Sequence, residues 1–297
     1  AHGRAEFNVA NAFTDHIDIN YIIFDTDSAA VQGYLKLYQT GSHRAAIPAV
    51  KEVNTSPNIY VSHIASTAEW WTGIVLLNTT SEEKELTITF DNDLSRPITL
   101  AANEQKIFDV AQAFFDGQPQ PLIQSAVIAN ASGIIGLEVF SSPAGGNQMD
   151  GILLTGKTAS TTCYPHVARA GDGWWTGIVA YNPSASDGTM NITSYGPDGN
   201  LLSPTTVPIL GKGKYVGTVE KLGLPADTVW FRIDSTPDIT GFELFGTSTS
   251  DSKQLAAYAG GGGTGAKTGV FPKIEKNGSG TGIAFVNTEP DEASITL

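Results

Sequence analysis

One nine-residue phrase occurs twice in this chain, and part of it occurs a third time. Residues 70–78 and 174–182 both read Trp-Trp-Thr-Gly-Ile-Val, then two apolar residues and Asn, 104 residues apart. Residues 280–287 repeat much of the phrase about 105 residues later. A fixed period of this size indicates one folding unit of about 100 residues that recurs along the chain.

The segments around the phrase recur as well. A β-rich run is followed each time by a turn and by a second run that opens on glycine. Apolar and polar residues alternate in these runs, which is typical of strands with one buried face. The only helical pattern covers one or two turns near residues 110–115. The first runs lie at 21–25, 125–129 and 229–233, and the second runs at 33–38, 136–140 and 241–245.

Short strands with turn residues between them and no crossover helices predict an all-β fold. We expect tandem immunoglobulin-like antiparallel β-sandwich modules of about 104 residues. Residues 57–160 and 161–267 are predicted to be full modules. Residues 1–56 match the back half of a module, and residues 268–297 match the front part of one. Either the chain is cut from a longer array, or its two ends complete one module within one molecule or between neighbours.

Composition excludes several classes of function. The formal net charge of −13 and the pI of about 4.7 disfavour nucleic acid and anionic lipid as partners. No apolar run approaches the length of a membrane span, so membrane insertion is not expected. Cys163 is the single cysteine and is predicted to be a buried, unreactive thiol. Without a Cys/His cluster, structural zinc and covalent haem are not expected.

The paired tryptophans are the candidate carbohydrate- or partner-binding residues. Neighbouring side chains in a strand point to opposite faces, so Trp70 and Trp71 cannot share one core, and neither can Trp174 and Trp175. We expect one indole of each pair in the sandwich core and the other on the outer face or at a module junction. An exposed indole suits a sugar ring or a protein partner, while packing against the next module is the simpler alternative. The third copy has no tryptophan there.

Repeated ionisable residues give no sign of catalysis. His63 and His166 occupy corresponding positions, and Lys273 replaces them in the third copy; lysine does not replace a metal ligand. Glu138 and Glu243 also recur with the module, whereas a catalytic carboxylate pair needs two different environments. No nucleophile elbow or phosphate-binding loop is present. The chain is therefore predicted not to be an enzyme.

No cofactor is predicted, with calcium left open. Three acidic turns supply oxygen ligands of the kind that calcium prefers, but none completes an EF-hand loop. These turns lie at residues 25–27, 91–93 and 198–200.

The partial modules at the two ends carry apolar strand-like segments without their expected neighbours. An unpaired apolar edge is a template for another chain, so we expect self-association, with a head-to-tail homopolymer formed by strand complementation as the favoured form. The missing strands are of the type found at residues 6–13, 21–25 and 33–38. The predicted assembly residues are Phe7, Val9, Ile22, Phe24, Ile283, Phe285 and Ile295.

Three stretches resemble a known group of proteins: residues 163–167, 173–183 and 241–246. They are similar to the "FPH…GWxTGIxLxNP…GFxLFG" module of secreted bacterial tandem-repeat β-sandwich surface proteins, whose function is largely uncharacterised. The resemblance covers nearly the whole chain and implies export and repeated sandwiches, not a reaction. We therefore expect a non-enzymatic extracellular or cell-surface structural protein of a surface layer, filament or matrix. The alternatives are a carbohydrate-binding adhesin and, more weakly, a glycan-active enzyme.

Overall fold

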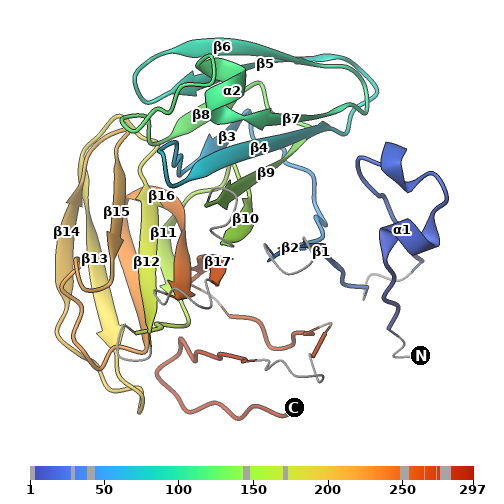
Figure 1. Cartoon of the computed structure of the whole chain (residues 1–297). Helices are drawn as coiled ribbons and strands as arrows, with labels where there is room; N and C mark the ends of the chain where they lie inside the picture. Colours follow the sequence, from blue (N-terminus) through green and yellow to red (C-terminus); the bar gives the residue numbers. More distant parts are fainter. Residues whose placement is uncertain are drawn as a thin grey trace.

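The structure is a computed structural model that describes residues 4–27, 31–38, 44–142, 148–169, 173–247, 254–263, 265–271, 273–274 and 282–297 (Figure 1). It is all-β, with several antiparallel sheets, as expected. The helical elements of the described part are α1 (Val9–Ala12), the 3-10 turn η1 (His16–Asp18) and α2 (Val110–Phe114). None of these is long and apolar enough to cross a membrane.

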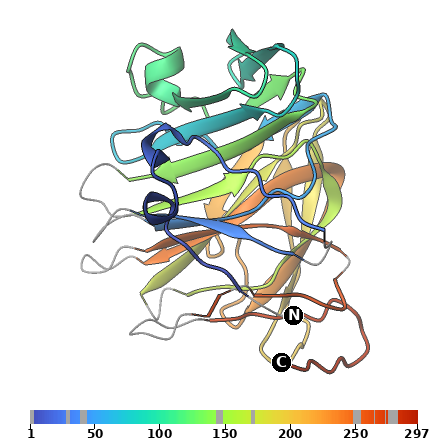
Figure 2. The ribbon, with the colours of Figure 1, turned by 90° about the vertical axis from the view of Figure 1, so that its right-hand side faces the viewer.

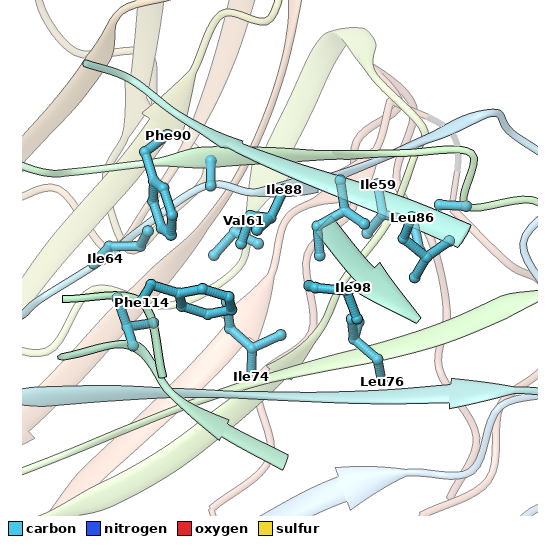
Figure 3. Packing of buried hydrophobic residues seen from close by; sticks show 14 of the residues in the cluster. Ile59, Val61, Ile64, Ile74, Leu76, Leu86, Ile88, Phe90, Ile98 and Phe114 are labelled. Atoms are coloured by element: carbon cyan, nitrogen blue, oxygen red, sulfur yellow. The ribbon is translucent and has the colours of Figure 1, made fainter. Parts of the chain in front are cut away.

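Two antiparallel sheets enclose the first core, and we call residues 58–154 unit 1. One sheet has the order β10-β9-β4-β7, and the other has the order β3-β8-β5-β6. Ile and Leu side chains of both sheets interdigitate with Phe90 and Phe114 in this core (Figure 3). The strands are β3 (Asn58–Val61), β4 (Trp71–Asn78), β5 (Lys84–Phe90), β6 (Ser95–Leu100), β7 (Gln105–Asp109), β8 (Ala126–Ala129), β9 (Ile134–Ser141) and β10 (Met149–Leu153).

A second pair of sheet layers follows in residues 159–262, which we call unit 2. One layer has the strand order β14-β13-β16-β11-β18. In the other layer, β12 pairs with β15 and β16, and β17 pairs with β16. Tyr164, Ile178, Ile192 and Phe231 lie in its separate core. The strands are β11 (Ala159–Tyr164), β12 (Trp174–Tyr181), β13 (Gly188–Tyr195), β14 (Thr205–Ile209), β15 (Lys214–Thr218), β16 (Trp230–Thr247), β17 (Leu255–Ala259) and β18 (Gly261–Gly262).

The two units differ where the chain crosses between layers. In unit 2, β16 is continuous: its first part pairs with β11 and β13, and its last part pairs with β12 and β17. In unit 1 the corresponding chain is divided into β8 and β9 by a turn. Asn130 and Gly133 in this turn have φ of 62° and 82°, the left-handed region that asparagine and glycine tolerate best.

The repeated phrase is explained by its packing. Thr72 accepts from the Ala65 amide and donates to the Ala65 carbonyl, and Thr176 makes the same pair with Ala168. Each threonine therefore ties β4 or β12 to the segment before it. The glycine after it leaves room for an indole ring: a Cβ at Gly73 would lie 2.8 Å from Trp71.

The tryptophans do not fill the cores, which corrects our expectation that one of each pair would. All four are half-buried, and neither core contains one. Trp71 and Trp175 begin the outer faces of β4 and β12, where they lie over Gly73 and Gly177. Thr72 is the first inner residue of β4, and Thr176 follows Trp174 on the inner face of β12.

The asparagine that ends the phrase builds the following turn. Asn78 is fully buried, and its side-chain amide donates to the carbonyls of Glu82, Leu100 and Ala101. Asn182 donates to Ser186 and Leu210 in the same way. The third copy forms the same local turn, because Asn287 donates to the Asp291 carbonyl and accepts from the Glu289 amide.

The terminal segments contain fewer strands than expected. Among the described residues of these segments, only β1 (Tyr34–Tyr38) and β2 (Arg44–Pro48) pair. Residues 6–13, 21–25 and the described part of 270–297, where strands are predicted, form none. Isolated strands leave main-chain groups without partners, so these segments stay irregular in the absence of neighbouring strands. Residues 9–12 form α1 instead, capped by Asn8 much as Asp109 caps α2.

The predicted assembly residues therefore lie outside strands. Val9 lies in α1 and is half-buried. Phe7, Ile22, Phe24, Ile283, Phe285 and Ile295 are exposed.

The glycine-rich run at residues 260–263 has the composition of a flexible linker, but part of it forms a strand. Gly261 and Gly262 form β18, which pairs with Thr162 and Cys163. Glycine is needed for this close approach, because a Cβ at Gly260 would lie 2.1 Å from Thr162. Cys163 itself is buried, as predicted.

Replacement of Asn78 by alanine tests the turn. It leaves buried carbonyls without donors, so we expect the free energy of unfolding to fall by about 2–4 kcal/mol. Asn92→Ala is the control, because Asn92 is exposed and makes one hydrogen bond, to the Leu94 amide. Urea unfolding measures both variants, and equal losses would contradict the structural role of Asn78.

Candidate functional site

The most distinctive site is the contact between the two units. In β12, all four residues from Ile178 to Tyr181 are buried, with exposed fractions of 0–3%. Alternation places Ile178 and Ala180 in the core of unit 2 and directs Val179 and Tyr181 to the opposite face. That outer face lies on the end of unit 1, so one sheet serves two interiors.

Aromatic rings make the apolar part of this contact. Phe140 of unit 1 stacks on Phe242 of unit 2, with ring centroids 5.6 Å apart and an interplanar angle of 1°. His63 meets the same Phe242 ring edge-on at 6.1 Å. Tyr60 and Tyr181 pair at 6.0 Å. With Val179, Phe140 and Phe242 form a third buried cluster that belongs to both units.

A lysine from unit 2 enters the end of unit 1. Lys214 pairs with Tyr181 across β15 and β12, so its side chain shares the outer face. Its ammonium lies 3.0 Å from His63 Nδ1 and donates to the Gln124 carbonyl at 2.6 Å. Burial, and then the charge of Lys214, lower the pKa of His63 to about 3, so Nδ1 of a neutral imidazole accepts this bond. We call His63, Gln124, Glu138 and Phe140 the junction socket.

Glu138 carries a buried carboxyl group in the socket. It is fully buried, and neither carboxyl oxygen makes a hydrogen bond of normal geometry. Burial raises the pKa of Glu138 to about 8, although Lys214 and the His63 amide act in the opposite direction. Burial likewise lowers the pKa of Lys214 to about 8. At neutral pH the socket therefore holds a protonated Glu138 and a charged Lys214.

Asp150 joins strands from three parts of the chain. Its Oδ2 accepts from the Ala257 amide of β17 at 2.5 Å, and its Oδ1 accepts from its neighbour Gly151 at 2.9 Å. The amides of Gly151, Ala257 and Ala46 (in β2) hold down its pKa, which burial raises to about 6. β10 accordingly packs against both β2 and β17. These three strands occupy corresponding positions in the repeat.

The contact between the N-terminal segment and unit 1 repeats the Lys214 contact. Gln105 begins β7 as Lys214 begins β15, and its amide donates to the Asn20 carbonyl at 3.0 Å. Asn20 precedes the run 21–25, just as Gln124 precedes the run 125–129. Tyr21 adds a bond to the Asn103 carbonyl at 3.0 Å. The same position of the repeat therefore donates to the same carbonyl position at two successive contacts.

The corresponding end of unit 2 is open and forms a pocket of about 760 Å³. The Val167 amide donates to the Val229 carbonyl as the Ile64 amide donates to the Gln124 carbonyl, so the backbone register matches Val229 with Gln124, one residue away from the match of the sequence runs. His166 and Phe245 of this pocket correspond to His63 and Phe140 of the junction socket. His166 meets Phe245 edge-on at 5.5 Å, and Phe245 is half-buried where Phe140 is buried. The open pocket is lined by His166, Val167, Ala168, Arg169, Trp174, Pro197, Asp198, Asn200, Ala226, Asp227, Thr228, Val229 and Phe245.

The open pocket combines an aromatic wall with a polar rim. Trp174 lies 6.5 Å from Phe245 between ring centroids. Arg169 is held by the carbonyls of Pro225 and Thr228, at 2.6 and 2.9 Å, so its guanidinium is largely committed to the pocket wall. Asp198 and Asp227 add exposed carboxylates.

Sequence reasoning found part of this site. Of the four candidate tryptophans, Trp174 lines the open pocket, and Trp70 lies just before β4. Lys214, Phe242 and Asp150 were missed. The unbroken apolar run at 178–181 was the available signal, because a strand buried on both faces does not alternate. In the described part of the chain, no three His, Cys, Asp or Glu side chains are grouped to hold a metal, the acidic turns included.

No protein-family model matches the chain, and no curated protein matches it significantly. Among solved structures, Thermotoga maritima 1070 is similar over 35% of this chain and 94% of its own, at 14% identity and a TM-score of 0.30. A calcium-binding mutant of Bacteroides uniformis β-glucuronidase 2 matches 70% of this chain, which spans 27% of that enzyme, at 13% identity and a TM-score of 0.18. Such TM-scores carry no conclusion about this chain.

Phe140 and Phe245 provide a matched pair for testing the junction. The strand pattern of the sequence predicts that both lie buried between layers, but only Phe140 is buried, because unit 2 covers it. Phe140→Ala should lower the free energy of unfolding by about 3–5 kcal/mol. Phe245→Ala should cost less than about 2 kcal/mol, because part of its ring already faces the pocket. Denaturant unfolding that gave equal losses would contradict this difference.

The buried carboxyl groups predict a pH dependence. Burial raises the pKa of Glu138 and of Glu243 from 4.5 to about 8. Between these values the folded protein keeps protons that the unfolded chain releases, so stability falls as pH rises. His63 and Lys214 have lowered pKa values in the fold, so their titration makes stability rise with pH. For His63 this rise ends near pH 6.5, its ordinary pKa, and for Lys214 it begins near pH 8. From pH 6.5 to 8 we expect a loss on the order of 1 kcal/mol per pH unit for each carboxyl.

Thermal unfolding at pH 6.5 and pH 8 measures this effect. Glu138→Gln should remove about half of the pH dependence, since one of the two carboxyls remains. Glu83→Gln, at an exposed position, should leave it unchanged. A melting temperature that rises with pH in this window would show that the carboxyl groups are ionised in the fold.

Proposed function

We propose that the protein is a non-enzymatic structural protein of an extracellular surface layer, filament or matrix. Its building blocks are tandem immunoglobulin-like β-sandwich modules of about 104 residues: two full modules at 57–160 and 161–267, with partial modules at 1–56 and 268–297. The modules function by docking on one another, so each docking site binds another module.

The entry of Lys214 into the junction socket is the observation that carries this proposal. The outer sheet face of unit 2 completes the interior of unit 1, so the contact resembles a domain core more than a loose linker. Gln105 makes the corresponding contact with the preceding segment. A contact that recurs at the same repeat position supports a role in building a rigid array. The net charge of −13 fits a soluble exported protein.

A second candidate is a carbohydrate-binding adhesin. One observation favours it: Trp174 stands beside the carboxylates and the Asn200 amide of the open pocket, and sugar sites combine such an aromatic platform with polar groups. For this function, Trp174→Ala should abolish binding on a glycan array, and Trp71→Ala, on the outer face of unit 1, should preserve it. Absence of glycan binding by the intact protein would remove this candidate.

Surface labelling of the source cells tests the structural function. Antibodies against the purified protein should label unpermeabilised cells in a continuous layer, filament or matrix when viewed by electron microscopy. Labelling that requires permeabilisation would contradict the extracellular role.

Module docking is tested separately with Lys214→Ala. Loss of the ammonium removes the donor that joins unit 2 to the Gln124 carbonyl and to His63 Nδ1, so units 1 and 2 should unfold in two calorimetric transitions. Lys221→Ala, at an exposed position of unit 2, should retain the transition of the unaltered protein. If Lys214→Ala also retained it, Lys214 would not couple the units.

A further inference from the structure

We propose that the open pocket of unit 2 is the third docking site of the molecule and that it receives the side chain of Arg4 from the same chain. This inference rests on the proposed structural function. The two terminal segments would then act together as a third unit, and the three units would close into a ring.

Arg4 occupies the repeat position of Gln105 and Lys214. Asn8 and Asp109 are the caps of α1 and α2, and Val9 and Val110 follow them. The buried Val219 holds this place in unit 2. Counting back five residues from each valine gives Arg4, Gln105 and Lys214. All three side chains carry N–H donors, and the latter two already donate to the carbonyl of a neighbouring unit.

The open pocket offers the matching acceptor. In the junction socket, the Gln124 carbonyl accepts from the Ile64 amide at 2.7 Å and from Lys214 at 2.6 Å. In the pocket, the Val229 carbonyl accepts from the Val167 amide at 2.9 Å. A carbonyl oxygen has two lone pairs, so Val229 can take a second donor from the pocket side.

The aromatic rings near the Val229 carbonyl also correspond to those near the Gln124 carbonyl. His166 stands against Phe245 as His63 stands close to the stacked pair of Phe140 and Phe242. At the junction socket, the outer sheet face of unit 2 supplies the apolar side chains that cover these rings. The terminal segments have apolar residues at those positions: Ala284 and Val286 correspond to Val179 and Tyr181, and Tyr34 corresponds to Phe242. The carboxylates of Asp198 and Asp227 suit a guanidinium better than an apolar or anionic ligand.

The position of the N-terminal segment favours closure within one molecule. This segment already contacts unit 1 of its own chain, through β2 against β10 and through Asn20. β2, β10 and β17 meet at Asp150, and corresponding strands that meet at one point describe units arranged about a common axis. The terminal segments also touch, because Lys273 donates to Glu6 at 2.6 Å. Figure 2 shows both ends of the chain at one end of the molecule.

In the present structure Arg4 is paired with Glu6, two residues away, and both are about half exposed. Docking in the pocket would exchange this solvated ion pair, which contributes little, for a charge-assisted bond to a partly enclosed carbonyl. The contact with unit 1 through β2 can remain in place during that exchange.

Cross-linking of the full chain tests the proposal. In a Cys163→Ser background, Arg4→Cys and Val229→Cys are combined and treated with a short bis-maleimide. We expect a cross-linked monomer, shown by mass spectrometry to join peptides that contain positions 4 and 229. The control pairs Arg4→Cys with Lys221→Cys, an exposed position, and should give little product. Cross-linked dimers, or no product above the control, would overturn the proposal.

Hydrogen exchange gives a second readout without cysteines. Arg4→Glu should make the amides of residues 166–168 and 226–229 exchange about tenfold faster, the factor for one charge-assisted bond. Arg4→Lys should preserve protection, and Arg96→Glu, at an exposed site in unit 1, should not change it. Exchange in the Arg4→Glu variant equal to that of the unaltered protein would overturn the proposal. Neither result affects the surface labelling or the Lys214→Ala test, so the proposed function succeeds or fails independently.

Discussion

A sheet that is apolar on both faces is the constraint on which this structure depends. The inner face of β12 is covered within unit 2, but Val179 and Tyr181 on its other face would lie in water if unit 2 stood alone. Unit 1 has the complementary deficiency, since its sheets leave Phe140, His63 and Glu138 uncovered at one end. When the outer sheet face of unit 2 covers this end of unit 1, both apolar surfaces are removed from water at once.

The ionisable groups at this contact select its geometry more than they strengthen it. Taking the Lys214 ammonium and the Glu138 carboxyl group out of water costs free energy that the hydrogen bonds of Lys214 do little more than offset. The same groups penalise every other arrangement, because a shifted sheet would leave a buried ammonium without the Gln124 carbonyl and His63 Nδ1. The apolar rings therefore provide adhesion, and Lys214 provides the register. Gln105 performs the second task without a charge at the preceding contact.

Much of the fold was predictable because the repeated sequence pattern indicates its strands and turns directly. The all-β class followed from alternation and turn residues, and the position of α2 followed from the single helical pattern. The phrase at 70–78 was recognised but partly misread: adjacent indoles suggested one core residue, whereas the threonine after them takes the inner position and glycine makes space for the ring. Propensity alone could not show that an indole would lie flat over its own strand.

The candidate site was less predictable, because it is made between repeats. Glu138 and Glu243 were noticed as recurring residues, but recurrence alone does not tell a buried acid from an exposed one. Lys214 has no sequence signal of its own, since its role depends on which sheet face meets unit 1. The strands expected in the terminal segments depended on neighbours that local sequence does not specify, and 9–12 formed α1 instead.

The continuous strand β16 has a consequence for how such chains can change during evolution. In unit 1 the passage between layers is a surface turn at Asn130 and Gly133, where extra residues can be accommodated without disturbing either sheet. In unit 2 the same passage lies inside one strand, which pairs with β13 of one layer up to Thr236 and with β12 of the other layer from Thr240. Insertions there would shift the register of one layer relative to the other. Related modules are thus free to acquire new loops at one place and are barred from doing so at its counterpart, although both descend from the same repeat.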